Sequence, residues 1–358
     1  RTAVGSPLSQ LTGYEHYYTD ELATQGSQLT VSLLNEQGPV TVTSAAFSST
    51  TPQVRIQMES VLARVLVYGE PRLAGGAKRG SAPAGYVLSP QARYTAPLRP
   101  LGLLRTGGSE VAGDGSHPED RYPTSRMCQE WKDSAPKSLT ELLSHFALDR
   151  MTSHEGGEDI YQARLLPDEQ ALATAVSNIH AYARETTLPP TAYLVGALPS
   201  LVIRFPYIPG GLTLRENEGW VSFRCKYYTE SQMKEWIRSD DFDDPTLAEA
   251  VKAARINEDS FTAPFEKGDL RFYYRGYNYY VVPIRHFDDT KAPTKTSIGR
   301  YGVVRGTEYR IHLTQILRPG TPVPPDLTAD LTPVAEEKNV HAIVSVRPIV
   351  VHSSEIHI

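Results

Sequence analysis

The clearest alternation of apolar and polar positions lies near the C-terminal end of the chain. Every second residue there is apolar, at Val340, Ala342, Val344 and Val346. Ser345 and Arg347 fall on the opposite face, and a period of two predicts a β-strand. Because Pro348 cannot donate a ladder hydrogen bond, we expect this strand to lie at a sheet edge or to bulge there.

An acidic, Pro-rich tether, residues 319–339, precedes this terminal segment, residues 340–358. Its prolines favour an extended, polyproline-like conformation. A strand that follows such a tether needs a sheet with which to pair. If its own domain is already complete, that sheet must belong to another molecule.

Strand-like patterns recur along most of the chain, at residues 28–34, 38–46, 53–70, 172–187, 191–205, 219–229, 269–287 and 301–317. In the third of these the alternation changes phase, which predicts a β-bulge near Glu59 and Ser60. Residues 269–287 predict a hairpin that turns at Arg275 and Gly276.

Two stretches have helical periodicity instead. Residues 139–150 predict a short amphipathic helix that begins near Ser138. Residues 230–253 predict one or two helices, split at Pro245. Residues 107–123 are rich in Gly and acidic side chains and predict a mobile loop.

The composition favours an all-β fold with minor helices. The chain has 358 residues, enough for two cores, and its 27 Pro and 26 Gly separate short runs rich in its 20 Tyr. Pro189 and Pro190 mark the best domain boundary. We therefore expect an N-terminal β-sandwich over residues 1–186 and a C-terminal β-sandwich over residues 187–318, followed by the tether and the terminal segment.

Charge and cysteine content narrow the class of protein further. The net charge of −5 argues against a nucleic-acid partner. Cys128 and Cys225 lack the spacing of a metal site, and they are either two separate thiols or one bridge.

Motifs of catalysis and of cofactor binding are absent from the sequence. It has no GxSxG nucleophile elbow, no Gly-rich phosphate loop and no HExxH pair, so we expect no enzyme and no cofactor. His286 with Asp288 and Asp289 could hold a cation, although a solvated turn is the simpler interpretation. His352 and His357 lie five positions apart and would point to opposite faces of a strand, which argues against a metal there.

The tyrosines of residues 273–280 (YYRGYNYY) allow two interpretations. They could form an aromatic strip that binds sugars, or half of them could face a core, as strand alternation favours. An adhesin or carbohydrate-binding module that uses this hairpin, or the loops of residues 72–123, is thus the alternative function.

Four segments, taken in order, resemble the fimbrillins of Bacteroidales, the type V pilins, and most closely the short-fimbria subunits of Porphyromonas type. They are QMESVLARVLV (57–67), ARETTLPPTAYLVGA (183–197), YYVVPIRHF with YGVVRGTEYRIHLTQIL (279–317) and VSVRPIVVHSSEIHI (344–358). Two positions depart from the family pattern: Gly306 stands where Asn is usual, and Ile349 stands where an aromatic residue is usual.

The resemblance implies a fold and an assembly mechanism. It implies two tandem antiparallel sandwiches of Greek-key, transthyretin-like type, with the N-terminal one lacking its first strands because only 27 residues precede Gln28. Family precursors are exported as lipoproteins, and an arginine-specific protease removes a first strand. A strand of the next subunit then fills the gap by β-augmentation.

From the resemblance we expect six residues to be buried in the neighbour's groove: Val344, Val346, Ile349, Val351, Ile356 and Ile358. Within residues 2–54 there is no Lys or Arg, so an arginine-directed cut in the N-terminal part would follow Arg1 or Arg55. A cut after Arg55 would split a predicted core strand, which makes Arg1, or a site upstream of this chain, the better candidate.

The expected function is that of a structural or accessory subunit of a cell-surface fimbria anchored at the outer membrane, with a tip-associated position as one option. Its expected partners are other fimbrial subunits, and host or bacterial surface proteins or glycans. The terminal segment is either donated to a neighbour or folded back on its own domain.

Overall fold

The structure is a computed structural model. It describes residues 23–24, 30–31, 33–35, 44, 53–56, 58–92, 131, 133–147, 161, 163–173, 181–286, 301–327, 330–334, 339–348 and 354–357. The predicted loop at residues 107–123 lies outside the described residues.

The described strands are β1 (Ala23–Thr24), β2 (Thr30–Val31), β3 (Leu33–Asn35), β4 (Gln53–Ile56), β5 (Met58–Ser60), β6 (Leu62–Tyr68), β7 (Arg72–Leu73), β8 (Lys78–Arg79), β9 (Gly85–Ser89), β10 (Gln91–Ala92), β11 (Phe146–Ala147), β12 (Ala163–Arg164), β13 (Ala181–Arg184), β14 (Thr186–Thr187), β15 (Ser200–Ile208), β16 (Trp220–Phe223), β17 (Lys226–Thr229), β18 (Phe265–Lys267), β19 (Leu270–Tyr273), β20 (Tyr277–Pro283), β21 (Gly302–Val303), β22 (Thr307–Ile316), β23 (Val340–Pro348) and β24 (Ser354–His357). The described helices are α3 (Leu139–His145), α4 (Glu169–Ala173), α5 (Glu230–Ser239), α6 (Pro245–Ala253) and the 3-10 turns η5 (Pro190–Ala192), η6 (Glu258–Thr262) and η7 (Tyr274–Gly276).

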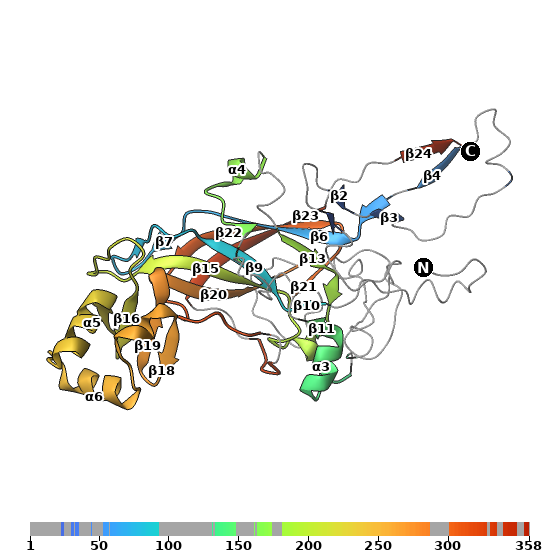
Figure 1. The fold of residues 1–358 in the computed structure, drawn as a ribbon. Coiled ribbons are helices and arrows are strands. Elements are labelled where there is room, and N and C mark those ends of the chain that lie inside the picture. Colours follow the sequence, from blue (N-terminus) through green and yellow to red (C-terminus); the bar gives the residue numbers. More distant parts are fainter. Residues whose placement is uncertain are drawn as a thin grey trace.

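Two sheets form a sandwich in the body of the molecule (Figure 1). One has the order β12-β9-β15-β20, with β8 also paired to β15. The other has the order β13-β6-β22-β23, with β7 also paired to β22. Their facing sides share one core, which includes Val65, Tyr86, Ile203, Tyr280, Ile311 and Val344. The fold is thus mostly β with few helices, as the composition predicts.

Each of these sheets takes strands from both sides of the predicted boundary at Pro189 and Pro190. β6 and β9 come from the N-terminal side, and β15 and β22 from the C-terminal side. β22 pairs with β6 in parallel, with Tyr309 opposite Val65 and Ile311 opposite Val67. The described residues therefore form one sandwich across the boundary, and a division into two tandem sandwiches stays a prediction.

In place of the predicted β-bulge near Glu59 and Ser60, the chain breaks into two strands with different partners. β5 ends at Ser60, Val61 bends, and β6 begins at Leu62. The Ser60 hydroxyl donates to the Leu62 carbonyl (2.8 Å) and accepts from its N–H (3.2 Å), so the side chain satisfies the backbone where the ladder stops.

An insertion, residues 219–276, lies between β15 and β20 at one end of the sandwich (Figure 1). It holds the four-stranded sheet β17-β16-β19-β18 and the helices α5 and α6. Its own core lies between the sheet and the helices and includes Val221, Phe223, Met233, Leu247, Val251 and Phe272. The predicted split of the helices at Pro245 is confirmed, because α5 ends at Ser239 and α6 begins at Pro245.

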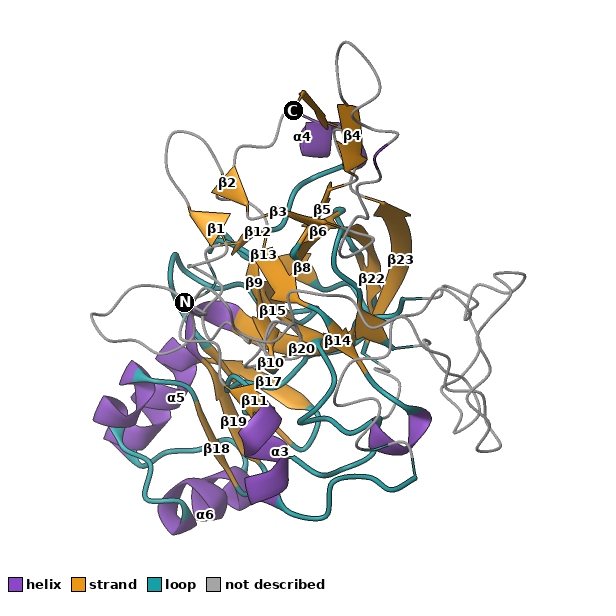
Figure 2. Ribbon diagram, turned by 90° about the vertical axis from the view of Figure 1, so that its right-hand side faces the viewer, coloured by secondary structure: helices purple, strands orange, loops and turns teal. Residues whose placement is uncertain are grey.

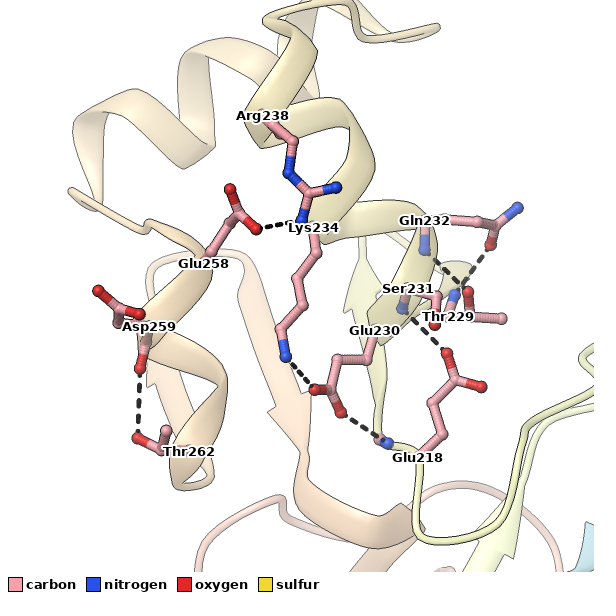
Figure 3. A network of polar contacts seen from close by, with 11 residues as sticks. Glu218, Thr229, Glu230, Ser231, Gln232, Lys234, Arg238, Glu258, Asp259 and Thr262 are labelled. Carbon is pink, nitrogen blue, oxygen red and sulfur yellow. Dashed lines mark hydrogen bonds and ion pairs between the residues drawn. The ribbon is translucent and has the colours of Figure 1, made fainter.

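Side chains at the start of α5 fix this helix to the loop before β16. Figure 3 shows the polar network around it. Thr229 and Gln232 form a capping box, and Glu230 accepts from the N–H of Gly219 (3.0 Å) and from Lys234 (2.6 Å). Glu218 accepts from the N–H of Ser231 (2.9 Å), which satisfies another donor of the first turn.

The insertion contacts the sandwich through stacked aromatic rings. Trp220 is fully buried and stacks on Tyr273, with ring centroids 3.7 Å apart. Its indole N–H donates to the carbonyl of Tyr207 on β15 (2.9 Å). Trp220 and Tyr273 belong to the sandwich core, whereas their neighbours Val221 and Phe272 belong to the core of the insertion. The sheet of the insertion is therefore covered on both faces.

The predicted hairpin over residues 269–287 is wrong, although its turn is placed correctly. β19 pairs with β16 and β18 in the insertion, whereas β20 pairs with β15 in the sandwich. The chain passes from one to the other at Arg275 (φ 54°) and Gly276 (φ 69°). Stacking of Tyr273 on Trp220 holds β19 in the insertion, a long-range contact that local alternation does not reveal.

Three other predicted strands are divided. Residues 219–229 form β16 and β17 around a turn at Arg224 (φ 46°) and Cys225 (φ 65°), the backbone signs of a two-residue type I′ hairpin. Residues 191–205 begin within η5 and turns before β15, and residues 172–187 begin in α4 before β13 and β14. In each case the spacing of apolar residues fitted a single strand as well as the divided arrangement that the structure shows.

The predicted helix near Ser138 is present but short. α3 spans Leu139–His145, and the Ser138 hydroxyl accepts from the N–H of Glu141 (3.2 Å). Leu142 is buried, whereas Leu139 and Leu143 are exposed. Among the described residues, no helix is long and apolar enough to span a membrane.

A buried ion pair generates a prediction about stability. Arg305 and Glu185 lie 2.8 Å apart, and their side chains are 1% and 5% exposed. Glu185→Gln should lower the free energy of unfolding by about 3–5 kcal/mol, because it leaves a buried guanidinium without its counter-charge. Denaturant unfolding measures this loss.

The control is Asp269→Asn, which removes the exposed pair of Asp269 with Arg224. It should cost at most about 1 kcal/mol. Equal losses in the two variants would show that the buried pair has no special weight.

Candidate subunit-assembly site

β23 is the edge strand of its sheet and pairs antiparallel with β22. The ladder begins with Val340 opposite Ile316 and ends with Pro348 opposite Thr307, with one irregularity between Leu313 and Gln315. Pro348 is the last residue of the edge strand, so the predicted edge position is confirmed.

The predicted alternation of this strand is also confirmed. Val340 and Val344 are buried in the sandwich core, and Ala342 and Val346 pack against it. Ile343 lies on the opposite face and is 53% exposed. The terminal segment thus has a sheet in its own chain, which is the folded-back arrangement.

Three of the six residues predicted to enter a neighbour's groove lie in the described part of the chain, on two different strands. Val344 and Val346 are on β23, where Val344 lies in the core of its own chain and Val346 packs against that core. Ile356 is on β24, opposite Val54 of β4. Ile349, Val351 and Ile358 lie outside the described residues, as does Arg1.

β24 and β4 form a separate two-stranded sheet. It extends away from the body of the sandwich, beside the C-terminal end of the chain (Figure 1). Its register places Glu355 opposite Arg55 and Ser354 opposite Ile56. The terminal segment is therefore divided between two strands with different partners.

The tether is bonded to the sandwich where it begins. The N–H of Gly320 donates to Oδ1 of Asn278 (3.0 Å), and the Gly320 carbonyl accepts from the Tyr273 hydroxyl (3.0 Å). Thr321 and Tyr279 exchange both backbone bonds, at 2.9 and 3.1 Å. A Cβ on Gly320 would lie 2.2 Å from the Tyr279 carbonyl oxygen, so this close approach requires glycine.

A second set of backbone bonds holds the tether further along. Val195 donates to the Thr332 carbonyl (2.9 Å) and Gly196 to the Asp330 carbonyl (2.8 Å). Leu327 is buried, and Leu331 and Val334 pack against a second core cluster. Sequence reasoning missed this docking, although the apolar residues between the prolines were a signal for it.

Tyr309 of β22 organises the turn before that strand. Its hydroxyl accepts from the N–H of Val304 (2.8 Å) and lies 2.8 Å from Nδ1 of His286. Gly306 has φ +67° in this turn, a left-handed conformation that Gly and Asn both tolerate. The departure from the family pattern at Gly306 is thus compatible with the backbone.

The candidate cation site is only partly described, because Asp288 and Asp289 lie outside the described residues. His286 is hydrogen-bonded to Tyr309. Among the described residues, no three His, Cys, Asp or Glu side chains are placed to hold a metal ion. Cys225 is an exposed free thiol, and Cys128 lies outside the described residues.

The tyrosines of residues 273–280 pack mainly into cores. Tyr273, Tyr279 and Tyr280 are buried, and Tyr274 and Tyr277 are half-buried. The interpretation as core residues is confirmed, and these side chains form no exposed strip.

Glu308 of β22 joins three elements through ion pairs. Its buried carboxylate pairs with Arg64 of β6 and with Arg310, which also pairs with Glu169 of α4 (3.0 Å). Burial raises the pKa of Glu308, but the hydrogen bonds and charges of Arg310 and Arg64 outweigh it and lower the pKa below its ordinary value.

Comparison with known proteins shows what this arrangement of strands is similar to. Residues 271–355 match the family model of "Major fimbrial subunit protein type IV, Fimbrillin, C-terminal". The matched region extends from β19 into β24.

Two solved structures are also similar. A fimbrilin (fimA) from Porphyromonas gingivalis W83 is 17% identical, with a TM-score of 0.33, and the match covers 85% of this chain and 61% of that chain. A proposed cell adhesion protein from Parabacteroides distasonis ATCC 8503 is 14% identical, with a TM-score of 0.30, covering 82% and 60%. TM-scores of this size are too low to establish a common fold.

The chain spans about three fifths of the length of these two proteins. No curated protein matches it. The matched family model describes a fimbrial subunit protein, in agreement with the expectation of a non-enzymatic, structural role.

The orientation of β23 generates a second prediction. Val344→Asp should destabilise the isolated protein by at least about 3 kcal/mol, because it buries a carboxylate opposite Ile311. The adjacent Ile343→Asp changes an exposed position and should cost less than about 1 kcal/mol. Thermal unfolding of the monomer measures both, and equal effects would contradict the folded-back placement.

The charge network generates a prediction about pH. Because the folded-state pKa of Glu308 is lowered, its stabilising contribution is present above the unfolded pKa of about 4.3 and is lost as pH falls through the folded pKa. Glu308→Gln should therefore lower the unfolding midpoint at pH 7 and reduce its fall between pH 5 and acid.

The matched control is Glu266→Gln, which removes an exposed carboxylate paired with Arg271. It should leave the acid limb of the stability curve close to that of the unmodified protein. A Glu308→Gln curve parallel to the unmodified one would contradict the assignment.

Proposed function

We propose that this chain is a subunit of a cell-surface fimbria and that its terminal segment joins it to the neighbouring subunit by strand exchange. The match of residues 271–355 to the fimbrillin C-terminal family supports the first part. The edge position of β23, with alternate side chains facing a core, is the observation that supports the second.

Strand exchange between subunits would be driven by backbone hydrogen bonds and by burial of apolar side chains. A strand that leaves a sheet exposes unpaired N–H and C=O groups beside an apolar groove, and a strand of another molecule can satisfy both. If all six predicted side chains were buried, at about 1.5–3 kcal/mol each, the gain would be on the order of ten kcal/mol before ordering costs. Main-chain bonds would supply affinity, and alternate side chains would set the register.

Export and maturation belong to the same proposal. The precursor would be an exported lipoprotein, and the subunit would reach a fimbria anchored at the outer membrane. An arginine-specific protease would release it, with the cut after Arg1. N-terminal sequencing of the protein recovered from the cell surface tests this site, and a different first residue would overturn it.

The proposal extends to the position of the subunit in the fimbria and to its ligands. We assign the chain as a structural or accessory subunit, with a tip-associated position and with host or bacterial surface proteins or glycans as ligands. The alternative of a carbohydrate-binding module loses its tyrosine strip, because Tyr273, Tyr279 and Tyr280 are buried.

Truncation of the chain tests the assembly role. A chain that ends at Asn339, and so lacks residues 340–358, should no longer co-purify with partner subunits from fimbriated cells. A synthetic peptide of residues 340–358, added during refolding, should restore the thermal unfolding midpoint, because it supplies the missing edge strand. Unchanged incorporation of the truncated chain into fimbriae would overturn the proposal.

A further inference from the structure

The three tryptophans of the chain differ in how far they are buried. Trp131 is fully buried, and its indole N–H donates to the Glu141 carboxylate (3.1 Å). Trp220 is also fully buried, and its N–H donates to the Tyr207 carbonyl (2.9 Å). Trp236 of α5 is only half-buried, and its N–H has no hydrogen-bond partner among the described residues. Part of the Trp236 ring and its polar atom are therefore available to a ligand.

Two further aromatic rings lie beside Trp236 on the insertion. Tyr228 of β17 meets it edge-on, with ring centroids 5.4 Å apart and an interplanar angle of 74°. Phe242, between α5 and α6, has its ring centroid 6.0 Å from that of Trp236. All three side chains are half-buried, so they rest on the core of the insertion without being enclosed by it. We call Tyr228, Trp236 and Phe242 the aromatic cluster.

Charged groups surround the hydroxyl of Tyr228. Lys226 pairs with one oxygen of Asp244 (2.9 Å), and the other oxygen accepts from the N–H of Thr246 at the start of α6. Asp243 is exposed and has no hydrogen-bond or ion-pair partner in the described part of the chain. Burial raises the pKa of Tyr228. Lys226 lowers this pKa whereas Asp244 and Asp243 raise it, so all three charges act on the same hydroxyl.

An aromatic surface edged by polar groups suits the ring of a sugar. A hexose presents C–H bonds on a face that packs against aromatic rings, and its hydroxyl groups need donors and acceptors at the rim. The aromatic cluster supplies the apolar surface. The Trp236 N–H, the Tyr228 hydroxyl and the Asp243 carboxylate supply donors and acceptors that the described protein does not use itself.

The charges at this surface favour a neutral ligand. Two carboxylates, Asp243 and Asp244, face one ammonium group, that of Lys226. The same loop between α5 and α6 also carries Asp240 and Asp241. A carboxylate or sulfate on a ligand would therefore meet an excess of negative charge, which costs affinity. A neutral oligosaccharide meets no such repulsion.

The position of the aromatic cluster separates it from the terminal segment. The insertion lies at the end of the molecule opposite β4 and β24 (Figure 1). Residues 219–270 precede the region that matches the fimbrillin model, so that match does not account for the cluster. Ligand binding and subunit assembly can thus be measured as two separate properties.

We propose that the aromatic cluster binds a neutral sugar residue of a glycan, and that Asp243 and the Lys226–Asp244 pair contact its hydroxyl groups. This inference rests on the proposed function, for which it names the class of ligand and the surface that binds it.

Saccharide binding to the full chain tests the inference. The probes are an array of neutral glucose-, galactose- and mannose-type oligosaccharides, each beside its sialylated or sulfated counterpart. We expect at least one neutral oligosaccharide to bind, and its acidic counterpart to bind at least about tenfold more weakly. In solution the same oligosaccharide should change the tryptophan fluorescence. Because Trp131 and Trp220 are buried, that change reports on Trp236.

Two variants and one control locate the site. Trp236→Ala should weaken binding by at least about tenfold, because it removes the central ring of the aromatic cluster. Asp243→Lys changes an exposed position, so it should leave the unfolding midpoint unchanged and shift the preference toward the acidic counterpart. The control is Tyr274→Ala, which removes another half-buried ring that packs on the same core and should leave saccharide binding unchanged.

Binding to none of the neutral oligosaccharides would overturn the inference. Equal losses in Trp236→Ala and Tyr274→Ala would do the same. If Trp236→Ala lowers the unfolding midpoint, Asp243→Lys decides, and an unchanged preference between neutral and acidic saccharides would contradict the site.

Assembly distinguishes this inference from the proposed function. The Trp236→Ala chain should still co-purify with partner subunits from fimbriated cells. If saccharide binding fails while the unmodified chain co-purifies, the inference is wrong and the proposed function stands. If the unmodified chain binds the saccharide but does not co-purify with any subunit, the proposed function is wrong and the sugar site stands.

Discussion

The two edges of β22 are the constraint on which the rest of the structure depends. One edge pairs in parallel with β6 and β7, and the other pairs antiparallel with β23. Between them, Tyr309, Ile311 and Leu313 point into the sandwich core and are fully buried. A strand from the N-terminal side, a strand near the end of the chain and the core thus meet on one element.

The two strands of the terminal segment, β23 and β24, have different structural roles. β23 completes the sandwich core of its own chain, whereas β24 pairs with β4 in a separate two-stranded sheet. The stack of Trp220 on Tyr273 fixes the insertion at one end of the sandwich. β4, which pairs with β24, lies at the opposite end of the molecule from the insertion (Figure 2). The terminal segment therefore has one strand within the sandwich and one strand outside it.

Local secondary structure could be predicted from the sequence wherever a short pattern of residues determines it. The alternation from Val340 to Val346, the helix break at Pro245 and the turn at Arg275 and Gly276 all follow from periodicity or from backbone preference. The family resemblance also pointed to the region that the fimbrillin model matches. These signals lie within a few neighbouring residues.

Partners distant in sequence could not be predicted in this way. Alternation with a period of two indicates which face of a strand is buried, but it does not indicate which strand lies beside it. The parallel pairing of β6 with β22 could therefore not be predicted. The turn at Arg224 and Cys225 has positive φ at both residues, although neither is Gly or Asn. Leu327 is buried although it lies in a Pro-rich part of the sequence. The described residues of the candidate site therefore lie on two strands with separate partners, a division that the sequence pattern did not indicate.

Hydrogen exchange of the terminal segment, measured by mass spectrometry in the free and the assembled protein, tests the central claim most directly. The account predicts that amides of the terminal segment, residues 340–358, gain protection on assembly. Unchanged protection of this segment on assembly would contradict it.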